Sequence, residues 1–171
     1  EWKYLVNETL IGEKCIIPLL IQVLQSDGIS NSDLTAEIER QLSEERNHVR
    51  IYFKHVGADK MEGSQYDKPL FELISKIDSP TLKLFALQGM LEGIALGAVE
   101  YRLLHWKSSF SHKGDEQVRR EESNHTTLSY PFFKELIAIE GSISLSKFKD
   151  VSKSVNGIFA ESFSGKNLKD H

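Results

Sequence analysis

Apolar residues recur along the chain at intervals of three and four positions. This spacing places side chains on one face of an α-helix, whereas a half-buried β-strand would alternate apolar and polar residues at intervals of two. No segment of the sequence shows that alternation. We therefore expect an all-α fold.

The apolar pattern and the turn residues that interrupt it predict five helices. Asp78 or Ser79 can cap the third helix and Pro80 suits its first turn, while Gly57 and Gly141 follow the expected ends of the second and fourth. Between positions 57 and 78 the chain is polar, with one short helical stretch at "LFELISKI". The expected helices cover about residues 2–25, 33–56, 80–106, 115–139 and 142–160.

The connections between these helices predict the architecture. Two helix pairs with short connections, joined by one long crossover, describe a four-helix bundle, to which a short fifth helix is added at the C-terminal side. A chain of 171 residues is expected to form a single domain. Its core would span about residues 2–140, followed by the additional helix at about 142–160 and a polar tail at 161–171.

Composition and charge exclude several classes of protein. The net charge of −4 gives no reason to expect a nucleic acid or an anionic membrane as a partner. The most apolar run, "CIIPLLIQVL", is too short to span a bilayer, and no targeting segment is visible. Because Cys15 is the single cysteine, no internal disulfide is expected and a cytoplasmic location is predicted.

A short motif occurs twice, as "EERNH" at Glu44 to His48 and as "EESNH" at Glu121 to His125. In a helix, residues three positions apart project from the same face. The second acid and the histidine of each motif, Glu45 with His48 and Glu122 with His125, can therefore bind one metal ion together.

Four glutamates lie on the apolar faces of the expected helices, one on each helix of the bundle. Glu45 shares its face with Leu42 and Tyr52, and the other three are Glu13, Glu92 and Glu122. An ionised carboxylate in an apolar interior is costly unless it is neutralised, paired or bound to metal. Lys and Arg are too few on these faces to pair with all four acids.

The separations along the chain place the four glutamates at one depth in the bundle. Glu13 and Glu45 are 32 residues apart, and Glu92 and Glu122 are 30 residues apart, as antiparallel neighbours at one height should be. Glu8 and Glu100 are the alternative acids on the first and third helices. Their separations from Glu45 and Glu122, 37 and 22 residues, fit less well.

This arrangement resembles the ferritin-like di-iron carboxylate superfamily, which includes bacterioferritins, rubrerythrins, ribonucleotide reductase small subunits and di-iron oxygenases. The resemblance covers about residues 2–140 and implies a ferritin-like fold. It implies that Glu45 and Glu122 bridge two metals. It further implies that one site is completed by Glu13 and His48, the other by Glu92 and His125, and that Glu44 and Glu121 each hydrogen-bond the histidine of the opposite motif.

Carboxylate and imidazole ligands without thiolate suit two iron ions, or manganese, better than a structural zinc ion. Haem is not expected, because Arg46 stands where the resemblance to bacterioferritin would require a methionine. The presence of both Glu-x-x-His motifs favours redox chemistry over simple storage. Rubrerythrins have a further glutamate one turn after the third-helix ligand, and here Ala95 and Leu96 occupy that neighbourhood.

The resemblance therefore implies an oxidoreductase that activates O2 or peroxide, an oxygenase or oxidase acting on an unknown small organic substrate with an unknown electron donor. A homodimer is compatible with this function. The alternatives are ferritin-like iron oxidation and storage, peroxide detoxification, or a structural bundle without metal.

Other residues carry open interpretations. Gly89, Gly93 and Gly97 either open space for a substrate beside the metals or allow close helix packing. Tyr52 and Tyr101 are either core residues or near enough to a metal for radical chemistry. The remaining histidines are expected in solvent, and they are His55, His105 and His112.

Overall fold

The computed structural model describes residues 2–26, 29, 32–56, 67–105, 112–141 and 143–163. Every regular element among them is helical and none is a strand, which confirms the all-α prediction. The elements in chain order are α1 (Trp2–Leu24), α2 (Ser32–Val56), α3 (Asp67–Ser75), α4 (Pro80–Leu84), the π-helix η2 (Phe85–Leu91), α5 (Glu92–His105), α6 (His112–Glu140) and α7 (Leu145–Phe163).

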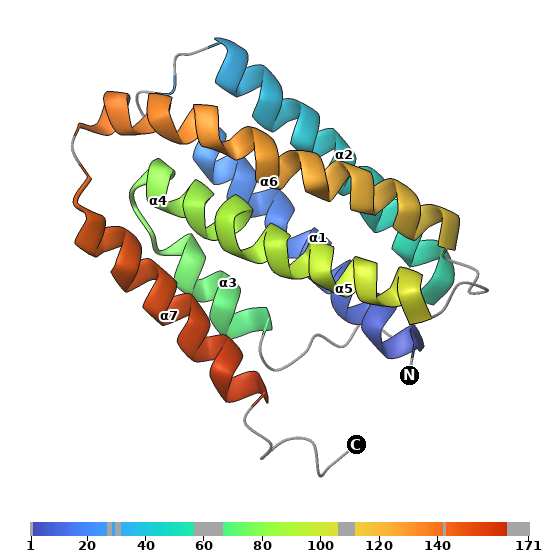
Figure 1. The fold of residues 1–171 in the computed structure, drawn as a ribbon. Coiled ribbons are helices and arrows are strands. Elements are labelled where there is room, and N and C mark those ends of the chain that lie inside the picture. The colour runs from blue at the N-terminus through green and yellow to red at the C-terminus, as the bar shows by residue number, and fades with distance from the viewer. Residues whose placement is uncertain are drawn as a thin grey trace.

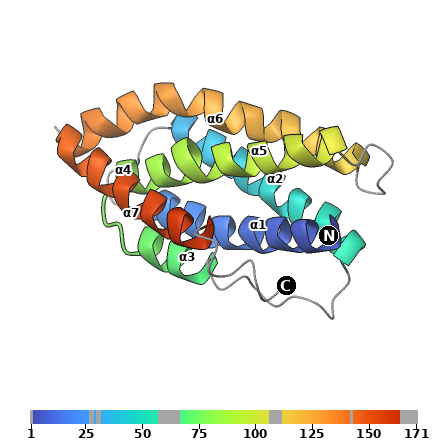
Figure 2. The same cartoon turned by 60° about the horizontal axis from the view of Figure 1, so that its bottom comes forward.

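The four long helices run side by side (Figure 1). α1 packs most extensively against α2, and α5 against α6, each pair antiparallel. Since α2 and α5 run in the same direction, the chain between them must return along the bundle, and α3 lies on that return path. Figure 2 shows α3 and α7 on the side of α1 and α4. The expected polar tail lies outside the described residues, except that α7 includes its first three positions, 161–163.

The apolar interior is divided into two clusters along the bundle. The larger contains Ile16 of α1, Leu42 of α2 and Leu91 of η2, and the smaller contains Leu10 of α1 and Tyr52 of α2. On each long helix, the sequence passes from one cluster to the other through buried charged residues. The predicted metal ligands therefore lie between two apolar layers.

The third long helix differs from the ordinary α-helix that the sequence predicted. It begins as expected, because the Ser79 hydroxyl accepts a hydrogen bond from the Leu82 amide at 3.1 Å and Pro80 follows the cap. The turns from Phe85 to Leu91 are then π-helical, and the Glu92 amide donates to the Leu87 carbonyl, five residues back. π segments are rare and frequently lie at functional sites, and this one immediately precedes a predicted ligand.

The continuous helical stretch Pro80–His105 is long and apolar enough to cross a membrane by length and composition alone. Half of its most apolar window is buried inside the protein, and the core helix of a bundle passes the same test. This stretch carries Glu92. At the end of α6, Gly141 adopts a φ of 79°, so this glycine terminates the helix as predicted.

Candidate metal centre

The structure brings all six predicted ligand residues together in the interior. Glu13 comes from α1, the pair Glu45 and His48 from α2, Glu92 from α5, and the last two, Glu122 and His125, from α6. None of the six is more than 2% exposed. Of the alternative acids, Glu100 is exposed on α5, and the side chain of Glu8 lies outside the described residues.

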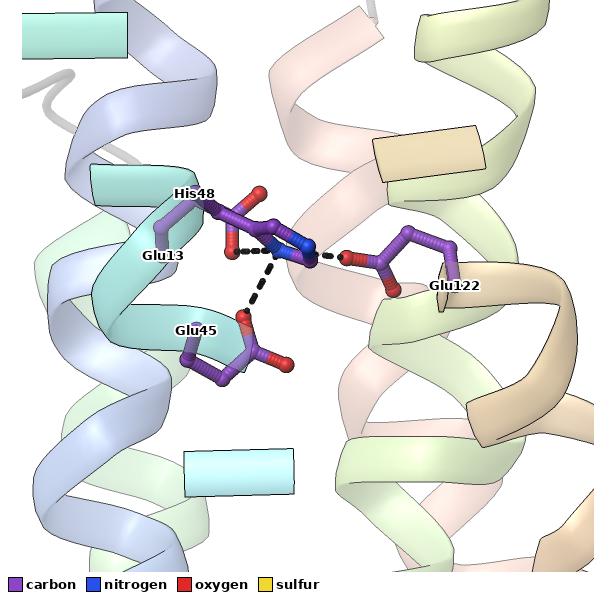
Figure 3. Close-up of side chains that lie close together, drawn as sticks. All are labelled: Glu13, Glu45, His48 and Glu122. Atoms are coloured by element: carbon purple, nitrogen blue, oxygen red, sulfur yellow. Dashed lines mark hydrogen bonds and ion pairs between the residues drawn. The ribbon is translucent and has the colours of Figure 1, made fainter. Parts of the chain in front are cut away.

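These residues form two groups that could each hold a metal ion. One group contains Glu13, Glu45, His48 and Glu122, and Figure 3 shows their side chains converging from three helices. The other contains Glu45, Glu92, Glu122 and His125. Within each group the four ligand atoms lie within 4.8 Å of one another. Glu45 and Glu122 belong to both groups.

Each histidine directs Nδ1 at three carboxylates. His48 Nδ1 lies 3.3 Å from Glu13 Oε2, Glu45 Oε2 and Glu122 Oε1. His125 Nδ1 lies 3.3 Å from Glu45 Oε1 and 3.5 Å from both Glu92 Oε2 and Glu122 Oε2. One N–H can donate well to only one of three acceptors placed around it, so direct hydrogen bonding does not account for this geometry.

The other ring nitrogen of each histidine contacts an acid from the opposite motif. His48 Nε2 lies 2.7 Å from Glu121 Oε2, and His125 Nε2 lies 2.8 Å from Glu44 Oε2. Arg40 donates to Glu44. A carboxylate at Nε2 keeps the proton on that nitrogen and leaves Nδ1 free to bind a cation. These are the two crossed contacts that the resemblance implied for Glu44 and Glu121.

Burial and mutual repulsion strongly perturb the acids. Burial raises the pKa of Glu13 and Glu92 well above the usual glutamate value, and the charge of Glu45 raises both further. Burial acts in the same direction on Glu122. Nevertheless, the contacts with Glu92 and the two histidines outweigh it and hold the pKa of Glu122 below its usual value.

The two histidines are strongly basic in the protein without metal. Burial alone would lower their pKa values, but the surrounding carboxylates outweigh it. The contacts with Glu122 and Glu92 raise the pKa of His125 to about 12, and those with Glu122, Glu13 and Glu45 raise that of His48 as well. The cluster therefore retains positive charge, either as protons or as bound cations.

The donor set fits two divalent cations. Two atoms that bind one ion at about 2.0–2.2 Å lie roughly 3.0–3.5 Å apart for bond angles between tetrahedral and octahedral. The distances around each Nδ1 have this size. Several buried ligand atoms have no hydrogen-bond partner among the described residues, including both oxygens of Glu122 and Nδ1 of His125. Two divalent ions would also cancel the four glutamate charges.

Two buried glutamines next to the cluster were not predicted as part of it. Gln41 donates to Glu92 Oε1 at 2.8 Å and, more weakly, to Glu45 Oε1 at 3.5 Å. Gln88, from the π segment, donates to Gln41 Oε1 at 2.7 Å. The signal for Gln41 was present in the sequence, because it precedes Glu45 by four residues and so shares its face.

A second polar network, centred on the buried Arg102 and Asp115, lies beyond the cluster on the side of Tyr52. Arg102 donates to Asp115 Oδ1 at 2.9 Å, to the Tyr52 hydroxyl at 2.9 Å and to Thr9 Oγ1 at 2.7 Å. Tyr52 also donates to Asp115 at 3.1 Å. Tyr52 is fully buried as expected of a core residue, whereas the placement of Tyr101 on the inner face was wrong, since it is 51% exposed.

Both interpretations of the third-helix glycines are wrong for Gly93 and Gly97. These residues face solvent, and a Cβ at either would meet nothing within 4 Å among the described residues. A Cβ at Gly89 would meet the Phe85 ring at 3.2 Å, which is a contact within the same helix. His105 is exposed as expected, and the side chains of His55 and His112 lie outside the described residues.

Comparison with known proteins adds no family assignment. No protein-family model matches the chain, and neither curated proteins nor solved structures give a match. The functional argument therefore depends on the geometry of the buried cluster.

Proposed function

We propose that this protein is a non-haem oxidoreductase with a dinuclear iron centre, or an iron and manganese centre, in a ferritin-like four-helix bundle. The observation that carries the proposal is the placement of each histidine Nδ1 among three carboxylate oxygens at 3.3–3.5 Å, while an outer acid occupies its Nε2. When bound, such a pair of metals supplies redox chemistry with O2 or peroxide. The substrate is a small organic molecule.

The residues of the chain have distinct roles in this proposal. Glu45 and Glu122 would bridge the two ions, because both belong to each candidate group. Glu13 and His48 would complete one position, and Glu92 and His125 the other. The flanking apolar clusters exclude water from the centre and so strengthen every interaction between charges inside it.

The outer residues orient the inner ones. Glu121 and Glu44 hold the proton on Nε2 of the two histidines, which fixes the ring tautomer in which Nδ1 can bind metal. Gln41 donates to one Glu92 oxygen, so that carboxylate is held in place before any ion binds. The single-domain organisation, the cytoplasmic location and a monomeric or homodimeric state belong to the same proposal.

Elemental analysis tests the centre directly. Protein reconstituted with Fe(II) under anaerobic conditions should retain two ions per chain after desalting, and it should consume O2 when air is admitted. Glu122→Ala should lose both ions, because this residue belongs to both groups. Glu39→Ala, at an exposed position of α2, is the matched control and should retain both. A folded wild-type protein that retains no metal would refute the proposal.

Size-exclusion chromatography separates this function from iron storage. A storage protein would form a cage eluting far above 19.5 kDa, the mass of one chain, whereas the proposed oxidoreductase would elute as a monomer or dimer. Iron mineral retained after Fe(II) oxidation would favour storage. Oxygen consumption without mineral formation would favour the oxidoreductase.

A further inference from the structure

An apolar cavity of about 270 Å³ lies beside Glu13, between α1 and α5. Its walls include Ile16, Leu91, Ala95 and Ala98, and aromatic residues from the two outer helices, Phe71 of α3 and Phe159 of α7, also line it. Ile94 and Tyr101 line the same cavity and are 43% and 51% exposed, so its mouth faces solvent. The cavity therefore connects the outside of the bundle to a residue of the candidate metal centre.

Glu13 contributes to both the cavity and the cluster. Its Oε2 lies 3.3 Å from His48 Nδ1, and its Oε1 is buried without a hydrogen-bond partner among the described residues. A carboxylate oxygen this deep in an apolar wall is costly unless a proton or a nearby cation neutralises the group. The carboxylate is itself only 2% exposed.

The two candidate metal positions are not equivalent with respect to this cavity. Glu92, the counterpart of Glu13, does not line the cavity, and Gln41 holds one of its oxygens at 2.8 Å. Glu13 receives no comparable amide hydrogen bond among the described contacts. Any molecule in the cavity would therefore lie next to the position of Glu13 and His48 rather than that of Glu92 and His125.

The lining defines the chemistry of the occupant. Most of the wall is apolar, and its polar groups are those of Glu13, Tyr101, Thr9 and Arg102. The Arg102 and Thr9 side chains hydrogen-bond to each other at 2.7 Å. Dry apolar cavities of about 150 Å³ hold benzene, so this larger cavity can accept roughly six to twelve non-hydrogen atoms. Charged or strongly hydrated molecules would lose their hydration over a mostly apolar wall that offers few polar partners.

We propose that this cavity binds a small apolar organic molecule, with its carbon skeleton beside Glu13, and that this molecule represents the substrate class of the enzyme. The assignment as a substrate rests on the proposed function, whereas the assignment as a binding site does not. The other reading, an empty packing defect, predicts no saturable binding.

Fluorine NMR with fluorobenzene as the probe tests this proposal on the metal-free protein. Wild type should bind the probe saturably. Ala95→Phe places a ring in the cavity and should weaken binding at least tenfold, while Ala36→Phe, at an exposed position of α2, should bind like wild type. Circular dichroism verifies that each variant is folded. No saturable binding to wild type, or equal binding by the folded Ala95→Phe protein, would overturn the proposal.

Loading with Mn(II) locates the bound probe. A paramagnetic ion next to Glu13 should strongly increase the relaxation rate of the bound fluorine, and Ala95→Phe should abolish the increase. If Mn(II) binds and the probe is bound without enhanced relaxation, the site beside Glu13 is refuted. If the probe binds but the folded protein takes up no metal, the proposed function fails and the cavity site stands.

Discussion

His48 Nε2 lies 2.7 Å from the carboxylate of Glu121, although the two residues are 73 positions apart and belong to different copies of the same motif. The reciprocal contact joins His125 to Glu44 at 2.8 Å. Each motif thus supplies two candidate metal ligands on its own helix and the acid that contacts the histidine of the other motif. The motif occurs twice because the first acid of each copy contacts the histidine of the other copy.

Removal of one outer acid should affect one metal position more than the other. Glu121→Ala deprives His48 of its acceptor, and the affinity at the Glu13 and His48 position should fall about 10- to 100-fold. Glu44→Ala should do the same at the position of His125. Competition titrations with a chromophoric chelator measure both affinities.

Glu39→Ala, on the exposed side of α2, serves as the control for the loss of a surface acid. An equal loss of metal affinity at both positions in the Glu121→Ala protein would contradict the prediction that Glu121 acts through His48.

The stability of the metal-free protein should fall as the pH rises from 7 to 9. The folded state retains a proton on His125, whose pKa is raised to about 12, while the unfolded chain releases it near 6.5. The resulting stabilisation is complete below pH 6.5 and is lost progressively up to about pH 12. The slope should be about 1.4 kcal/mol per pH unit for one such proton.

Urea unfolding of chelator-treated protein at pH 7, 8 and 9 measures this slope. Metal-loaded protein should not show it, because a bound ion replaces the proton and metal binding strengthens as protons are released. A metal-free protein that becomes more stable across this range would disagree with the protonated cluster.

The glutamine pair should show coupled energetics. Gln41→Leu removes the hydrogen bond to Glu92 and leaves the Gln88 amide buried without its acceptor, which should cost about 1–3 kcal/mol of unfolding free energy. Adding Gln88→Leu removes the unpaired group. The double variant should therefore be less destabilised than the sum of the two single variants, as a double-mutant cycle by urea unfolding will measure.

Arg102 and Asp115 should show the same kind of coupling, with a larger change in the free energy of unfolding. Arg102→Met leaves Asp115 charged and buried at 1% exposure, and it should lower the free energy of unfolding by about 3–5 kcal/mol. Arg102→Met combined with Asp115→Leu should recover part of that loss. Thermal and chemical unfolding of the three proteins provide the measurement, and additive losses would show that the pair is not coupled.

Substitution of two glycines by alanine should change the stability of the protein in opposite directions. Gly97→Ala should stabilise the protein by about 0.5–1 kcal/mol, because a Cβ there meets no described atom and the backbone is ordinary α-helix. Gly141→Ala should destabilise it, because the φ of 79° strains any residue with a Cβ. Differential scanning calorimetry would detect both changes, and a destabilised Gly97→Ala protein would indicate a contact outside the described residues.

Much of the fold followed from local patterns. Helical periodicity, caps such as Ser79 and the terminating Gly141 depend on nearby residues, so their signals are visible in one sequence. The convergence of Glu13, Glu45, Glu92 and Glu122 was also accessible, because the lengths of antiparallel helices determine which residues share a depth. Whether these residues bind metal stays a prediction.

The features that the sequence did not predict depend on tertiary contacts, which local patterns do not encode. In the π segment a backbone hydrogen bond spans five residues instead of four, and the spacing of apolar residues does not predict this change. The pairing of Arg102 with Asp115 joins α5 to α6, and each residue alone resembles an ordinary surface charge in the sequence. The cavity beside Glu13 arises from how α1, α3, α5 and α7 fit together.

The π segment also has a genetic consequence. A π turn accommodates one residue more than an α turn, so the stretch Phe85–Leu91 contains one residue that a regular helix would not need. Because the wider turn takes up this residue, deletion of a single codon there should restore a regular helix and leave the helical faces on either side in phase. The 2.6 Å hydrogen bond from Ser79 to Glu140 should then persist.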